Sequence, residues 1–249
     1  MDYGTWDVDG KSVSVASTYR VAWRRMAATT GFRTLYPALI PPGAKHVHPV
    51  VAAGNPEKLD VVALTGASLS SILVDFRIRS GGASEIQASQ AKMLPVVVES
   101  EFREVLIERY LRLNCLTTAY RPLWEALTGN KWDAHTPIRN PLERQLAQIE
   151  IDVLVAVTFG ITVQELRRIY RTQFPVMRRY DQETLFDKGG KCLPKEVTRK
   201  HLAMTPNSNL TPEDRIWEHP QSGASYLFEY PFRVLDREGE MERLYKKYK

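Results

Sequence analysis

The sequence predicts an α+β fold in which a small mixed sheet with a packed helix comes first and a helical support region follows. Two observations lead to this prediction. Near the start of the chain, short runs alternate apolar and polar residues, as strands with one exposed face do. From Leu59 onward, apolar residues recur every three or four positions, as in amphipathic helices. Segments rich in Pro, Gly and charge divide the chain into three expected parts, 1–98, 99–180 and 181–249.

The first two strands are expected in YRVAWRRMAATTGFRTLYPALIPP, as the runs Tyr19–Ala27 and Thr34–Pro41. Val21 and Trp23 alternate with polar or small neighbours, and a Thr-Thr-Gly break separates the two runs. Guanidinium groups on paired strands suit phosphates and guanine edges, although each arginine taken alone fits a solvated strand face equally well. One hairpin would bring four such groups close together: Arg20, Arg24, Arg25 and Arg33.

A loop after this hairpin adds a basic cluster, Lys45, His46 and His48. The cluster can extend the arginine surface. The His-x-His spacing also occurs in metal sites, because two imidazoles two residues apart share one face of a strand. No third ligand with fitting spacing accompanies this pair, so the sequence favours the first interpretation.

One helix is expected from Leu59 to Arg79, ended by a Gly-Gly pair, and its apolar face is explained by core packing. The segment Ser84–Val98 then predicts a strand that carries Gln87, Gln90 and Lys92. Primary amides can both donate to and accept from adenine edges. The same two glutamines also fit an ordinary half-exposed strand.

The second part is expected to be helical. Glu101–Leu127 and Leu142–Phe159 carry apolar stripes at helical spacing, and Thr162 with Glu165 forms a capping box for a further helix. Residues 181–224 predict a long irregular segment with one short helix. A strand in YLFEYPF and a charged helix over Asp236–Tyr248 close the chain.

Taken in order, these stretches resemble the C-terminal target-recognition region of large adenine-specific DNA methylases. These methylases belong to single-chain type II restriction–modification systems and to related phage-defence systems of the DISARM and BREX kind. The resemblance includes the arginine hairpin, LRLNCLTTAYRPLWEAL, IEIDVLVAVTFGITVQELRRIYRTQFPV and YPFRVLDREGEMERLYKKYK, so it spans nearly the whole chain. Such methylases have a helix with D-F/Y-x-x-R and then a strand ending in L-P, which correspond here to Asp75, Phe76, Arg79, Leu94 and Pro95.

The resemblance implies a module that binds double-stranded DNA through the arginine hairpin and the Ser84–Val98 segment. It also implies that the module is either a truncated product or a separate subunit that docks on a methyltransferase chain. The residues expected to bind DNA are Arg20, Arg24, Arg25, Arg33, Thr34, Lys45, His46, His48, Gln87, Gln90 and Lys92.

Catalytic motifs of such a methylase are missing from the sequence. A flipped adenine would need an Asn-Pro-Pro-aromatic element, whereas Asn55-Pro56 continues with Glu57 and Asn140-Pro141 with Leu142. No glycine-rich turn for a methyl donor follows a strand. We therefore expect no catalytic residue, no metal and no cofactor in this chain. S-adenosyl-methionine is expected only with a catalytic partner or a missing N-terminal part, and whether the chain itself is an enzyme stays open.

Composition leaves an alternative in place. The 34 Lys and Arg exceed the 29 Asp and Glu by 5, an excess that suits a polyanionic partner but is common in other proteins. Cys115 and Cys192 form no C-x-x-C motif and are expected to be free. No apolar run reaches the ~20 residues of a membrane helix and the polar start differs from a signal peptide, so we expect a cytoplasmic protein without membrane contact. The alternative is an α+β interaction or scaffold protein without DNA affinity, since packing alone explains its helical stripes.

Overall fold

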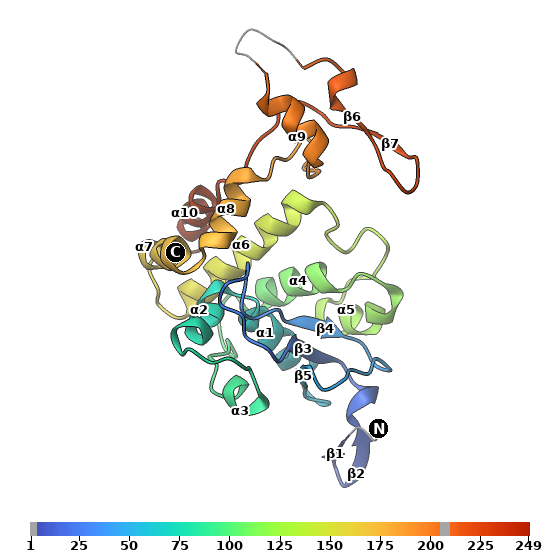
Figure 1. Cartoon of the computed structure of the whole chain (residues 1–249). Coiled ribbons are helices and arrows are strands. Elements are labelled where there is room, and N and C mark those ends of the chain that lie inside the picture. The colour runs from blue at the N-terminus through green and yellow to red at the C-terminus, as the bar shows by residue number, and fades with distance from the viewer. Residues whose placement is uncertain (1–3, 205–209) are drawn as a thin grey trace.

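The computed structural model describes residues 4–204 and 210–249 and confirms the α+β class (Figure 1). Its central sheet has the strand order β4-β3-β5, formed by Ala38–Ile40, Arg20–Arg24 and Val50–Ala53. The predicted hairpin is confirmed, because β3 pairs antiparallel with β4. Both pairings of β3 are antiparallel, so the sheet is not mixed as expected. The connections are too short and irregular for the helical crossover that a parallel pair requires.

Strand β3 is buried on both faces, although its alternation of apolar with polar or small residues predicts one exposed face. Residues 20–23 are all buried, and helix α1 (Leu59–Leu69) packs against this strand. On the other side, the side chains of Arg20 and Trp6 close around Gly54, where an added Cβ would lie 2.9 Å from each. Trp6 belongs to the small hairpin of β1 and β2, which spans Thr5–Val8 and Lys11–Ser14. The predicted exposed strand face is therefore an interior one.

The helix predicted from Leu59 to Arg79 is two helices, α1 and α2 (Ile72–Ser80). The break follows from the two serines between them, because the Ser71 hydroxyl accepts a hydrogen bond from the Val74 amide at 3.3 Å and so begins a new helix. The carbonyl of Ser70 is left free of the helix, and it accepts hydrogen bonds from Arg33 and Gln148 at 2.8 and 2.9 Å. The break between α1 and α2 thus leaves the Ser70 carbonyl oxygen as a hydrogen-bond acceptor for side chains in the protein interior.

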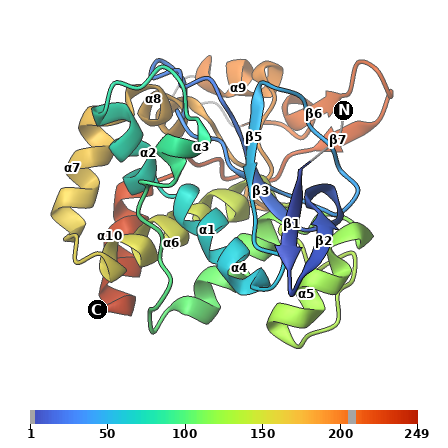
Figure 2. The ribbon, with the colours of Figure 1, turned by 90° about the horizontal axis from the view of Figure 1, so that it is seen from below.

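The second part is helical as predicted, and its longest helix, α6 (Pro141–Thr158), runs through the middle of the protein (Figure 2). Asn140 caps this helix by accepting from the amides of Leu142 and Glu143. The capping box predicted for α7 is also confirmed. On α6 pack α4 (Arg103–Asn114), α7 (Val163–Gln173) and α10 (Arg237–Tyr248). Helix α5 (Arg121–Thr128) packs on α4, and α8 (Pro175–Glu183) packs on α7. Single 3-10 turns occur at Val15–Ser17, Thr118–Tyr120 and Glu213–Arg215.

One hydrophobic core joins the first two predicted parts, because a single cluster of buried side chains extends from Tyr19 to Tyr245. The last part divides in two. Helix α10 packs on α6 within this core. An arm of α9 (Lys195–Leu202), β6 (Ile216–Glu218) and β7 (Ser225–Leu227) protrudes from the body, with its own small cluster (Figure 1). Residues 205–209 of the segment predicted as irregular lie outside the described residues.

Both cysteines are free, as predicted, with Cys115 buried and Cys192 exposed. In the part of the chain that the structure describes, no single helix has the length and apolar character needed to cross a membrane. Only α1 and α2 together meet that requirement, and they are bent against each other by 64°.

A carboxylate on α6 fixes the C-terminal helix and makes stability depend on pH. Glu150 accepts hydrogen bonds from the Tyr248 hydroxyl and from Arg109, and Lys247 lies 3.4 Å away. Burial raises the pKa of Glu150, but these bonds outweigh it and hold the pKa below the usual 4.5. The lowered pKa stabilises the fold above about pH 4.5, and this contribution is lost as pH falls through the folded-state value.

We therefore expect Glu150→Gln to be less stable than the wild-type chain at pH 7, with a difference that shrinks as pH falls below 4.5. Urea unfolding followed by circular dichroism at several pH values measures this difference. Glu104→Gln, at an exposed position of α4, is the control and should show no such trend. A difference that stays constant from pH 7 to pH 3 would contradict this account of Glu150.

Candidate nucleic-acid interface

An open hollow of about 510 Å³ brings together four of the residues predicted to bind DNA. These are Arg25, His46, His48 and Gln87. They come from the end of β3, the loop before β5 and the start of the short helix α3 (Ala88–Ala91), and strand β5 forms the floor. We call this hollow the β5 pocket.

Arg25 and Gln87 are oriented by a carboxylate that the sequence analysis did not single out. Glu85 accepts hydrogen bonds from Arg25 Nε at 3.1 Å, from Arg25 Nη2 at 2.8 Å and from Gln87 Nε2 at 2.9 Å. The bonds from Gln87 and Arg25 lower the pKa of Glu85. One carboxylate therefore holds a guanidinium and a primary amide side by side on the rim of the β5 pocket.

His48 extends this row of polar groups. Its Nε2 lies 2.6 Å from Arg25 Nη1. A guanidinium can only donate, so a hydrogen bond between these two atoms uses the imidazole nitrogen as the acceptor. His46 lines the same hollow. Among residues 4–204 and 210–249, no group of three or more His, Cys, Asp or Glu side chains is arranged to hold a metal ion.

The predicted strand over Ser84–Val98 is wrong, because its middle forms α3. Gln87 and Gln90 make a capping box in which the side-chain Oε1 of Gln90 accepts from the backbone N–H of Gln87 at 3.0 Å. Only the start of the segment is strand-like, where the Ile86 amide donates to the Arg25 carbonyl at 2.6 Å. The spacing of three between the glutamines was the available signal, since it is typical of a helix start. Gln90 is occupied as a cap, whereas Gln87 faces the β5 pocket.

Three further predicted residues, Arg24, Lys45 and Lys92, are exposed but do not line this hollow. Arg24 donates to the Met26 carbonyl at 3.0 Å, and its guanidinium lies 5.4 Å from the centre of the Tyr36 ring. These contacts hold the Arg24 side chain against the surface without covering its charge.

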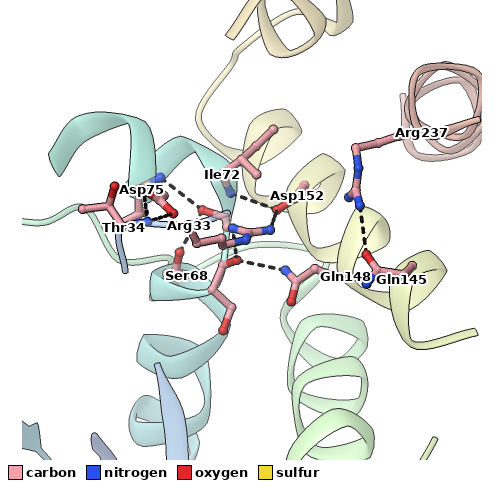
Figure 3. Close-up of polar contacts among 12 residues, drawn as sticks. Arg33, Thr34, Ser68, Ile72, Asp75, Gln145, Gln148, Asp152 and Arg237 are labelled. Carbon is pink, nitrogen blue, oxygen red and sulfur yellow. Dashed lines mark hydrogen bonds and ion pairs between the residues drawn. The ribbon is translucent and has the colours of Figure 1, made fainter. Parts of the chain in front are cut away.

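Arg20, Arg33 and Thr34 lie in the interior, which corrects their place in the predicted DNA-binding set. Figure 3 shows Arg33 and Thr34. Arg20 donates to the Ala44 carbonyl at 2.5 Å. Arg33 donates to the Ser70 carbonyl, and its Nη2 lies 3.7 Å from Asp152.

The Thr34 amide donates to the Asp75 carboxylate at 3.0 Å, so this residue too has an internal role. Side chains that are already buried among helices cannot reach a duplex. The signal for this was Asp152, an acidic residue within the apolar run of α6, which requires a buried cation nearby.

No family model matches this chain, and no curated protein or solved structure does so either.

Proposed function

We propose that the protein is a DNA-binding target-recognition module, of the kind that resembles the C-terminal part of an adenine-specific DNA methyltransferase in restriction–modification or phage defence. One observation carries the proposal most directly. Glu85 holds Arg25 and Gln87 side by side on the rim of the open β5 pocket. Guanidinium and primary amide groups are the side chains that read guanine and adenine edges in the major groove.

Fixing these two groups in advance favours specific binding, because less side-chain freedom is lost when they meet a base edge. Arg24, Lys45 and Lys92 are exposed cations from the same part of the chain. They would contact phosphates and so set the register of the duplex, while Arg25 and Gln87 would read bases. The buried Arg20, Arg33 and Thr34 take no part.

The methylation chemistry belongs, in this proposal, to a separate methyltransferase chain or to a longer form of the protein. S-adenosyl-methionine would bind there and not in this chain. Such a module works in the cytoplasm, where the DNA of a restriction–modification system is modified.

The direct test mixes the purified chain with random duplex DNA at two salt concentrations and sequences the retained fraction. We expect enrichment of particular bases. Arg25→Ala should weaken binding to the enriched sequence by about 1–3 kcal/mol and relax the preference at one position. Arg24→Ala should weaken all sequences equally and reduce the salt slope by about one unit.

Arg139→Ala serves as the control, because it removes the same charge at an exposed site outside the β5 pocket. It should leave both affinity and sequence preference unchanged. Binding that is equal in Arg24→Ala, Arg25→Ala and the wild-type chain would exclude these residues from the interface.

A second candidate is an α+β interaction or scaffold protein without DNA affinity. The burial of Arg20 and Arg33 favours it, since half of the arginine hairpin serves the interior. If the purified chain retains no DNA even at low salt, the result supports this second candidate over the DNA-binding module.

A further inference from the structure

A second cavity, of about 270 Å³, lies between the residues before β4, the break after α1, the end of α4 and the first half of α6. It shares no lining residue with the β5 pocket. Its polar lining includes three guanidinium groups, those of Arg33, Arg144 and Arg237, together with the amides of Gln145 and Gln148. Figure 3 labels Arg33, Arg237 and the two glutamines. We call it the arginine cavity.

The charges around the arginine cavity leave a positive excess. Among the residues that the structure describes, no carboxylate lines it. Two carboxylates that are not part of the lining contact its arginines: Asp181 forms an ion pair with Arg237, and Asp152 lies near Arg33. These two carboxylates balance at most two of the three guanidiniums.

Arg144 carries the uncompensated charge. Its guanidinium donates only to the carbonyls of Leu113 and Ile138, at 2.8 to 3.1 Å, and within the described residues it forms no ion pair. Burial and the neighbouring Arg139 lower the pKa of Arg144, as expected for a partly buried cation without a counter-charge beside it.

Hydrogen-bond donors around the cavity are also held in place and not fully used. Arg237 is 2% exposed and lines the cavity, and its Nη1 has no hydrogen-bond partner among the described residues. Its Nη2 donates to the Gln145 side-chain oxygen at 2.9 Å. Because this bond uses the oxygen of the Gln145 amide, the NH₂ group of the same amide can donate to a ligand. A buried donor without a partner is costly unless a ligand or water satisfies it.

We propose that the arginine cavity binds the phosphate group of a small ligand. Three guanidiniums and an amide supply charge-assisted donors for its oxygens. The apolar side chains of Leu35, Pro37 and Leu113 line the same cavity and would pack against a compact organic body. The volume accommodates a free phosphate or part of a mononucleotide.

The test measures binding to the full chain by calorimetry with three probes: inorganic phosphate, a 5′-nucleoside monophosphate and the matching nucleoside. We expect both phosphate-bearing probes to bind and the nucleoside not to bind. Equal affinity for the first two identifies free phosphate as sufficient, whereas tighter binding of the monophosphate shows that the apolar wall contributes.

Two variants locate the site. Gln145→Glu places a carboxylate beside Arg237 and should weaken phosphate binding about tenfold or more, while it can still pair with that arginine. Arg144→Gln removes the uncompensated charge and should act in the same direction. Arg168→Gln is the matched control, since this exposed residue of α7 lines neither the arginine cavity nor the β5 pocket, and it should bind phosphate like the wild-type chain.

Three outcomes would overturn the assignment. They are absence of phosphate binding at millimolar concentration, binding of the nucleoside as tight as that of the monophosphate, and wild-type affinity in Gln145→Glu. Each is independent of whether the β5 pocket binds DNA.

Discussion

Replacing Asp181 by alanine is expected to lower the free energy of unfolding by about 3–5 kcal/mol. The Asp181 carboxylate accepts from Arg237 Nε at 2.6 Å, from Arg237 Nη2 at 3.1 Å and from the Tyr170 hydroxyl at 2.7 Å. The side chain of Arg237 is 1% exposed. Without Asp181, a guanidinium remains buried with its nearest counter-charge gone, and this is what makes the loss large.

Urea unfolding of wild-type and variant chains measures the change. Glu240→Ala is the control, because it breaks the exposed ion pair of Glu240 and Arg243 within α10 and should cost at most about 1 kcal/mol. A similar loss in both variants would contradict the special position of Asp181.

The double variant Asp181→Leu with Arg237→Met removes both charges of the ion pair. Compared with Asp181→Ala, it separates the destabilisation caused by an unpaired buried guanidinium from the net contribution of the ion pair to the free energy of unfolding. Apolar residues of similar size in place of a buried pair are often neutral. We therefore expect the double variant to be more stable than Asp181→Ala. It would also remove one wall of the arginine cavity, so phosphate binding should be lost even where the fold is kept.

The hairpin of β3 and β4, the long helix α6 and the capping box of α7 were predictable because each depends on residues close together in sequence. Apolar spacing and local caps fix such elements with little help from the rest of the chain. The same holds for the break at Gly160, which follows α6 in the described structure with a positive φ of 71°.

The errors share a different cause. Arg33 was predicted to be exposed because arginine is mostly exposed, but its ion pair with Asp152 joins positions 33 and 152. A partner that far along the chain leaves only an indirect signal, here the acidic Asp152 within the apolar run of α6. Glu85 was missed because its role depends on Arg25, which lies 60 positions earlier in the chain.

The first interface also depends on how the chain turns after Glu85. A strand over Ser84–Val98 would have spread Gln87 and Gln90 along one edge. Instead Gln90 caps α3 and leaves Gln87 beside Arg25. The sequence therefore named four of the residues that line the β5 pocket, but it predicted a strand where the structure has α3.

Gly66→Ala is expected to destabilise the protein by about 3 kcal/mol, although alanine is the better helix former. Gly66 lies inside α1, and a Cβ at this position would overlap the phenol ring of Tyr110 on α4. That ring is fully buried and has no space to move into. The glycine exists here for close packing of two helices, which its position in an apolar helical pattern does not reveal.

A double-mutant cycle with Tyr110→Leu tests this reason, because contacting residues give non-additive changes. The cost of Gly66→Ala should fall clearly when the ring is absent. Gly81→Ala is the control, since Gly81 has a φ of −79° and an added Cβ there would be 3.4 Å from its nearest neighbour, an ordinary contact. It should change the unfolding free energy by no more than about 0.5 kcal/mol. An equal cost of Gly66→Ala with and without the Tyr110 ring would show that the close approach of α1 and α4 is not what selects glycine.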